Sequence, residues 1–169
     1  MYKSVYAVIL ISLATTAGCS ETSSAVPLST SASITKVNYQ LPVEPANAVE
    51  VLDVRENAKD GEAINVIGRV GGGINPWVKG RAAFLLVDTR ITPECEDEHC
   101  DANCPDCAKE MMAASTMVKF VDLQGKVLPV DAQSLLGIKD SETVVVRGVA
   151  HRDQAGNVSV EADGLYIKR

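Results

Sequence analysis

Short apolar segments of alternating pattern, separated by glycine-containing turns, fill most of the chain after residue 60 and constrain what it can fold into. Alternation with a period of two is typical of strands that bury one face. The pattern predicts a mainly β domain with five strands and two short helices. The predicted strands are residues 64–70, 82–87, 117–121, 143–150 and a broken fifth strand, 158–162 with 165–167; the predicted helices are residues 49–59 and a short one that starts after Asp131 and ends at Gly137.

Two of the predicted strands contain a glycine at the same relative position. Residues 65–70 (Asn-Val-Ile-Gly-Arg-Val) resemble residues 145–150 (Val-Val-Arg-Gly-Val-Ala). A glycine inside a strand often marks a bulge, a tight bend or a close approach of another backbone. We therefore expect a bulge or bend at Gly68.

A helix between the third and fourth of five strands is the outline of the OB-fold, a partly open five-stranded barrel. The stretch 60–70, with an acid–glycine turn and a Val-x-Gly-x-Val strand, resembles the opening of bacterial periplasmic OB-fold proteins. Residues 49–169 also resemble bacterial lipoproteins whose second strand is similar to Gly-Arg-Ala-Ala-Phe at 80–84. The resemblance implies a small OB-fold-like barrel in the cell envelope but no activity, because function resides in sites rather than folds. An ordinary β-sandwich or small open barrel is the alternative.

The N-terminus predicts export. Lys3 precedes an apolar run, residues 5–14, that only Ser12 interrupts. This pattern is typical of a signal peptide, here residues 1–18. About ten apolar residues are too few to cross a bilayer core, so a permanent transmembrane helix is not expected.

The small residues Thr16-Ala17-Gly18 before Cys19 resemble the lipobox of bacterial lipoproteins, in which the cysteine is acylated and becomes the mature N-terminus. Thr16 stands where that family usually has Leu, and a plain secretory cut after Ala17 is the alternative. Five cysteines are an odd number for a secreted chain, and lipidation of Cys19 leaves an even group of four. Ser20 follows instead of Asp, which by resemblance to lipoprotein sorting implies a lipid anchor at the periplasmic face of the outer membrane.

Composition separates a tether from a domain and argues against one class of partner. Residues 20–48 are rich in Ser, Thr, Ala and Pro without a period, so residues 19–48 are predicted to be a lipid-anchored flexible tether and 49–169 one domain. Loss of residues 1–18 removes Lys3 and no acid, so the formal net charge changes from −6 to −7. An acidic domain with few aromatic rings is a poor partner for nucleic acid.

A cysteine-rich insertion, about residues 91–112, lies between the second and third predicted strands. Residues 94–107 contain four cysteines, one histidine and six acidic residues, with almost no apolar side chain. Burial therefore cannot order this segment, and a disulfide or a metal ion would have to. The candidate residues are Cys95, His99, Cys100, Cys104 and Cys107.

Three interpretations of these cysteines stay open. The envelope is oxidising and even groups of cysteines there usually pair, so two disulfides of unknown pairing are the leading prediction. The spacing C-x₄-C-x₃-C-x₂-C could instead enclose one zinc or copper(I) ion, with His99 in place of a thiolate. Cys104-Pro105-Asp106-Cys107 also leads into a predicted helix and resembles the C-P-x-C of thioredoxin-like enzymes, which implies dithiol redox chemistry.

The loop between the first and second predicted strands contains Trp77, Lys79 and Arg81. OB-folds commonly bind ligands with this loop and the second and third strands. An exposed tryptophan beside two cations would suit contact with an envelope protein or a glycan. Burial of the ring against the barrel end is the slightly favoured alternative, because a large apolar ring gains most from burial.

No catalytic set can be assembled from the residues, because the only histidines are His99 and His151 and both lie in acidic or loop settings. The leading hypothesis is a non-catalytic envelope lipoprotein that acts as an OB-like binding module and needs no cofactor. The alternative is a periplasmic zinc- or copper-binding protein, or a dithiol redox protein, that uses the same cysteines.

Overall fold

The computed structural model describes residues 39–72, 75–91 and 105–169. Short strands account for most of the regular structure. The strands are β1 (Val49–Glu50), β2 (Ala63–Val70), β3 (Ala83–Val87), β4 (Ser115–Phe120), β5 (Thr143–Arg152) and β6 (Val158–Ile167), and the helices are α1 (Val51–Asn57), α2 (Pro105–Ala113) and α3 (Ala132–Leu136).

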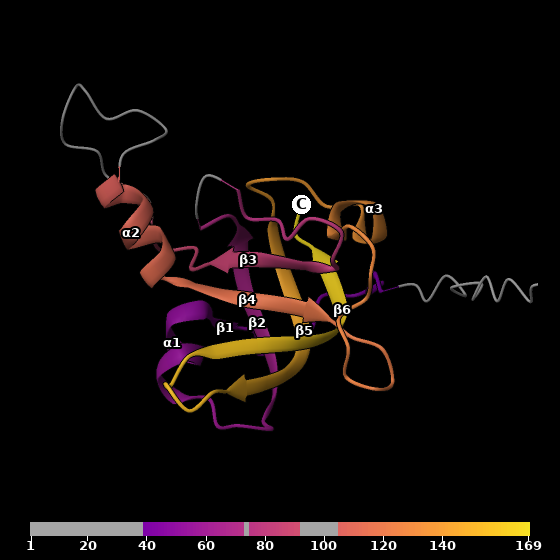
Figure 1. Ribbon diagram of the computed structural model, residues 1–169, viewed down its shortest axis with the longest axis horizontal. Coiled ribbons are helices and arrows are strands. Elements are labelled where there is room, and N and C mark those ends of the chain that lie inside the picture. Colours follow the sequence, from indigo (N-terminus) through magenta and orange to yellow (C-terminus); the bar gives the residue numbers. More distant parts are fainter. Residues whose placement is uncertain (1–38, 73–74, 92–104) are drawn as a thin grey trace, which may run out of the picture. The chain divides into compact units, whose positions relative to one another are not determined.

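Five strands form a closed barrel. They are neighbours in the order β2–β3–β4–β6–β5, and β5 pairs back onto β2. The β4–β6 pair is parallel and the other four pairs of the barrel are antiparallel, while β1 adds two residues in parallel to β2. In Figure 1, β3 and β4 run across the direction of β2 and β5. Since α3 lies between the third and fourth barrel strands, the predicted five-stranded OB-like barrel is confirmed.

Alternate residues of each strand point into the barrel and form one apolar core. In β4, Val118 and Phe120 are fully buried, whereas Met117 and Lys119 are partly exposed. The largest fully buried side chains are Phe84, Phe120, Leu86, Leu136, Ile138 and Leu165. Each such side chain stabilises the fold by roughly 1.5–3 kcal/mol relative to an exposed one, so this core is the main favourable contribution to stability.

Two strand glycines lie where another strand comes too close for a side chain. A Cβ atom on Gly68 would lie 2.5 Å from Cγ of Leu86, and one on Gly148 would lie 2.2 Å from the carbonyl oxygen of Glu161. Beside Gly148 the β5–β6 register shifts, which leaves Asp163 as an extra, bulged residue. The fifth barrel strand is therefore continuous instead of broken, because its pairing with β5 resumes on both sides of the bulge.

An N-terminal segment before β1 also belongs to the packed domain. The amide of Leu41 donates to the carbonyl of Leu165 and the amide of Leu165 to the carbonyl of Tyr39, both at 2.8 Å. The Tyr39 ring meets Phe120 edge-on, with ring centroids 5.0 Å apart. The domain thus includes residues from Tyr39 onward and extends into the stretch that the sequence assigns to the tether.

The short helices differ from the prediction at their ends. Residues 49–50, predicted as the start of a helix, pair with β2 as β1, and α1 begins at Val51. Helix α3 ends as predicted at Gly137, which has a left-handed backbone with φ of 68°. Asp131 precedes α3 but does not cap it with its side chain; its Oδ1 accepts a hydrogen bond from the amide of Gly80 at 2.7 Å instead.

The close approach at Gly148 predicts a large effect of a single methyl group. Gly148→Ala places Cβ against the backbone of β6, so it should lower the free energy of unfolding by about 3 kcal/mol. Gly71→Ala is the matched control, because a Cβ there meets Val87 Cγ1 at 3.5 Å and the carbonyl oxygen of Arg69 at 4.0 Å, both ordinary van der Waals distances. Urea denaturation measures both, and equal stabilities of the two variants would contradict the tight β5–β6 contact.

Candidate functional site

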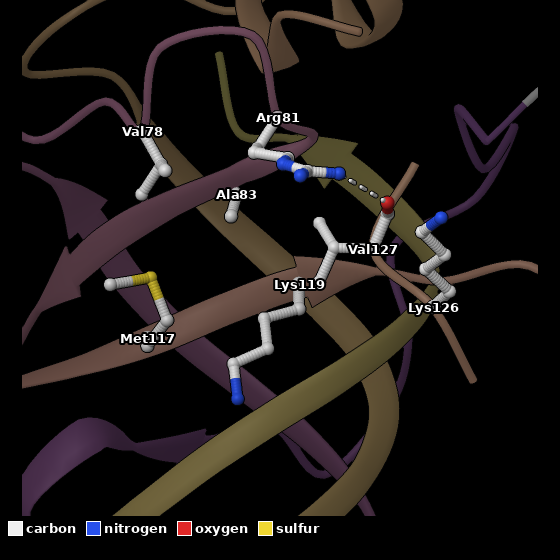
Figure 2. A pocket seen from close by; sticks show the side chains of 7 residues that line it. All are labelled: Val78, Arg81, Ala83, Met117, Lys119, Lys126 and Val127. Carbon is white, nitrogen blue, oxygen red and sulfur yellow. Dashed lines mark hydrogen bonds between the residues drawn. The ribbon is translucent and has the colours of Figure 1, made fainter. Parts of the chain in front are cut away.

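A pocket of about 400 Å³ lies on the outer face of β3 and β4 (Figure 2). Its lining comes from the loop between β2 and β3, from the two strands and from the turn after β4. The lining residues are Val78, Arg81, Ala83, Met117, Lys119, Lys126 and Val127. This volume is near the lower end of the roughly 300–1,000 Å³ that is typical of ligand pockets.

The pocket exists because a small residue lies among larger ones on this face. Ala83 of β3 is the Cα partner of Lys119 on β4, and the next outward pair is Leu85 with Met117. The single methyl group of Ala83 leaves space between longer side chains. Met117 borders this space with an unbranched, polarizable side chain that can adapt to what it contacts.

Hydrogen bonds fix both walls of the pocket. In the β2–β3 loop, the amide of Gly80 donates to Asp131 Oδ1 at 2.7 Å. In the turn after β4, the amide of Asp122 donates to the carbonyl of Lys126, and the amide of Lys126 donates to Asp122 Oδ1, both at 2.9 Å. Gly125 completes that turn with a positive φ of 76°, which glycine adopts without strain. The pocket is therefore preformed, with little ordering left for a ligand to cause.

The three cations of the pocket make few contacts with the protein. Figure 2 shows Arg81 reaching toward Val127, whose carbonyl accepts a hydrogen bond from Arg81 Nη1 at 3.5 Å. Lys119 Nζ donates to the hydroxyl of Ser159 at 3.2 Å. Among the described residues, no salt bridge includes Arg81, Lys119 or Lys126, whereas Arg90, Arg147 and Lys168 are each paired with a carboxylate. Three cations that no described carboxylate neutralises thus line one pocket of a chain whose net charge is −6.

The structure separates the three loop residues that the sequence singled out. Arg81 lines the pocket, while exposed Lys79 does not. Trp77 is half-buried and packs against Phe84 with ring centroids 5.8 Å apart. Its Nε1 donates to Asp140 Oδ1 at 2.6 Å. This geometry agrees with the packed alternative for Trp77 rather than with a free contact residue.

Sequence reasoning missed the half of the pocket that comes from β4 and the following turn. Met117 and Lys119 could have been selected, since they alternate outward on the third predicted strand, which commonly binds ligands in OB-folds. Lys126 and Val127 carried no such signal. Their place at the pocket depends on how the turn folds back beside the β2–β3 loop, where the amide of Ala82 donates to the carbonyl of Leu128 at 2.9 Å.

Most of the cysteine-rich insertion lies outside the described residues. Cys95, His99, Cys100 and Cys104 lie outside the described residues, as does Cys19. Cys107 lies in α2, which begins at Pro105, and its side chain is partly buried. Within residues 39–72, 75–91 and 105–169, no group of three or more His, Cys, Asp or Glu side chains is arranged to hold a metal ion. The disulfide, metal and dithiol interpretations therefore stay predictions.

Polar contacts attach both ends of the insertion to β1 and α1. Before the insertion, the Thr89 hydroxyl donates to Glu50 Oε1 at 2.6 Å. After it, the guanidinium of Arg55 donates to the carbonyl of Ser115, the first residue of β4. The residues just before and just after the insertion are thus held by β1 and α1, which adjoin each other in the sequence.

Asp88, at the end of β3, is the centre of this attachment. Its carboxylate is fully buried and accepts hydrogen bonds from the amide of Leu52 at 2.8 Å and from Arg90 Nε at 2.9 Å. Burial acts to raise the pKa of Asp88, but the hydrogen bonds from Arg90 and Leu52 and the charge of Arg90 outweigh it, so the pKa lies below its ordinary value. Asp88 therefore stays ionised and joins the first turn of α1 to β3.

His151 lies between two carboxylates at the barrel surface. Its Nδ1 is 3.6 Å from Asp60 Oδ1 and its Nε2 is 3.3 Å from Glu161 Oε2. Glu161 is the Cα partner of Lys119 in the parallel β4–β6 pair, but its carboxylate pairs with His151 rather than with that lysine. The arrangement is a polar contact at the barrel surface.

No protein-family model matches the chain, and a search of curated proteins finds no significant match. In the described part of the chain, no helix has the length and apolar character needed to cross a membrane. Any function must therefore be argued from the pocket and the sequence features themselves.

Proposed function

We propose that this chain is a non-catalytic cell-envelope lipoprotein whose OB-like barrel is a binding module, with its ligand site on the outer face of β3 and β4. The pocket carries the binding role. An apolar floor can bury hydrocarbon, while guanidinium and ammonium groups around it attract anions. Its lining includes no carboxylate, imidazole or thiol group that would pair with a lysine for acid–base chemistry, and the Ser159 hydroxyl that Lys119 contacts does not line the pocket.

The envelope location rests on the N-terminal sequence. Residues 1–18 have the pattern of a signal peptide, and acylation of Cys19 would anchor the mature chain at the periplasmic face of the outer membrane. Each buried CH₂ of the acyl chains contributes about 0.8 kcal/mol, so several chains give stable anchoring. Residues 20–38 would then connect the anchor to the packed domain.

We assign the insertion a structural role, with Cys95, Cys100, Cys104 and Cys107 paired as two disulfides. Cross-links of this kind offset the absence of an apolar core in residues 94–107 by restricting the unfolded chain. The alternative is a zinc or copper site that includes His99, or a working dithiol. One observation favours the dithiol form, since Cys107 lies in the first turn of α2, as in thioredoxin-like proteins.

The binding role predicts that an apolar anion will occupy the pocket. Anilinonaphthalene sulfonate should bind the folded protein with increased fluorescence, and Met117→Glu should weaken this binding about tenfold, because it puts a carboxylate into the apolar floor. Met112→Glu is the matched control, since Met112 is 61% exposed on α2 and does not line the pocket. Equal effects of the two substitutions would show that anilinonaphthalene sulfonate does not bind in the pocket.

The anchor and the cysteines can be tested together by the intact mass of the purified protein, before and after thiol alkylation under denaturing, non-reducing conditions. We expect a mass that begins at an acylated Cys19 and no alkylated thiol among the other four cysteines. Cys19→Ala should release the protein from membranes.

Other results would contradict either the lipid anchor or the disulfides. An unacylated wild-type protein in the soluble envelope fraction would rule out the anchor. Four alkylated thiols with one bound metal ion would replace the disulfides by a metal site, and two alkylated thiols would favour a dithiol at Cys104 and Cys107.

A further inference from the structure

The lining of the pocket narrows the chemistry of its ligand. Four of the lining residues are apolar and three are cationic, and none has an aromatic ring. Single-stranded nucleic acids are held largely by stacking of bases on aromatic side chains, which this lining lacks. Trp77 could have supplied a ring, but it packs on Phe84 and turns its indole N–H to Asp140.

Exposed apolar surface continues from the pocket into the turn after β4. Val78 in one wall of the pocket is 38% exposed. Leu123 is fully exposed in the turn that also contributes Lys126 to the lining, and it does not line the pocket itself. A ligand enclosed by the pocket alone would leave Leu123 in water. A chain that extends from the pocket along this turn would cover it, so the surface suits a polypeptide segment better than a small molecule.

The positive charge around the pocket favours an acidic polypeptide segment as the ligand. Arg81, Lys119 and Lys126 have no salt-bridge partner within the described ranges, although the chain has an excess of carboxylates. A guanidinium can bind a carboxylate through two hydrogen bonds, while lysine at a rim acts as a mobile point charge. Complementary charge of this kind raises association rates and excludes basic partners.

We infer that the β3–β4 pocket receives an acidic peptide segment of a partner protein, with an aliphatic side chain on the Met117 floor and flanking carboxylates at Arg81, Lys119 and Lys126. The inference rests on the binding role proposed above and adds the class of partner. The aliphatic anchor distinguishes such a segment from merely acidic ones. Residues 94–106 of this chain, for example, contain six acidic residues but no aliphatic side chain larger than alanine.

The test uses the whole purified chain, in phosphatidylcholine nanodiscs if it is acylated, so that no free detergent competes for the apolar floor. The probe is a fluorescent peptide with a pair of leucines flanked by glutamates, and binding is measured by fluorescence anisotropy. Peptides with serines in place of the leucines, or lysines in place of the glutamates, are the matched ligands. Each should bind at least about tenfold more weakly.

Variants of the protein test whether the peptide binds at the pocket. Lys126→Glu should weaken binding of the leucine–glutamate peptide about tenfold. Lys59→Glu makes the same change of net charge in the exposed turn before β2, outside the pocket, and should leave the affinity unchanged. Circular dichroism of each variant confirms that the barrel is folded.

Three outcomes would overturn the inference. Equal affinity for the serine and leucine peptides, or equal losses for Lys59→Glu and Lys126→Glu, would show that only net charge attracts the peptide. Binding of dodecanoate but of no peptide would make the ligand a small amphiphile, and the proposed binding role would stand. If neither the peptides nor dodecanoate binds, the binding role itself fails together with the inference.

Discussion

Strands β2 and β5 pair through seven consecutive Cα partners, from Ala63–Val149 to Arg69–Thr143, and the rest of the structure depends on this seam. It converts a row of strands into a barrel and buries Val66, Val144 and Val146 completely. Closure removes most of the exposed strand edges that would otherwise pair with other chains. The two seam strands also come close to their other neighbours, since a Cβ on Gly68 of β2 would meet Leu86 of β3 and one on Gly148 of β5 would meet the backbone of β6.

The pocket depends on the limited pairing between β2 and β3. Only two Cα pairs, Arg69–Val87 and Val70–Leu86, join β2 to β3, so the first half of β3 has no strand partner on that side. The loop between β2 and β3 forms hydrogen bonds with this half of β3 instead. The amide of Val78 donates to the carbonyl of Ala83 at 3.1 Å, and the amide of Leu85 donates to the carbonyl of Pro76 at 2.8 Å. Val78 and Arg81 are thereby positioned beside the outer face of β4, where they form the wall of a cationic, apolar-floored site.

Local patterns predicted most of the barrel and little of the site. The strands were predictable because alternation is a property of neighbouring residues, and Gly137 marked a helix end for the same reason. The pairing of residues 39–41 with β6 could not be predicted, since three residues are too few to establish an alternating pattern in the sequence. The pocket joins residues as distant as Val78 and Val127, so only the folded chain shows them together. A bulge or bend was expected at Gly68. The β2–β5 register is regular there, so Gly68 marks no bulge, and the closeness of Leu86 is what excludes a side chain.

Amide hydrogen exchange of the β2–β5 seam tests the central claim that the closed barrel holds the structure together. If it does, the amides of the seam, with those of Val144 and Val146 among them, exchange only through global unfolding and are the slowest in the protein. Their protection should also be the same in oxidised and reduced protein, because the barrel core is separate from the cysteine-rich insertion. Seam amides that exchange faster than the amides of β4 and β6 would show that the barrel opens between β2 and β5, and would contradict the account.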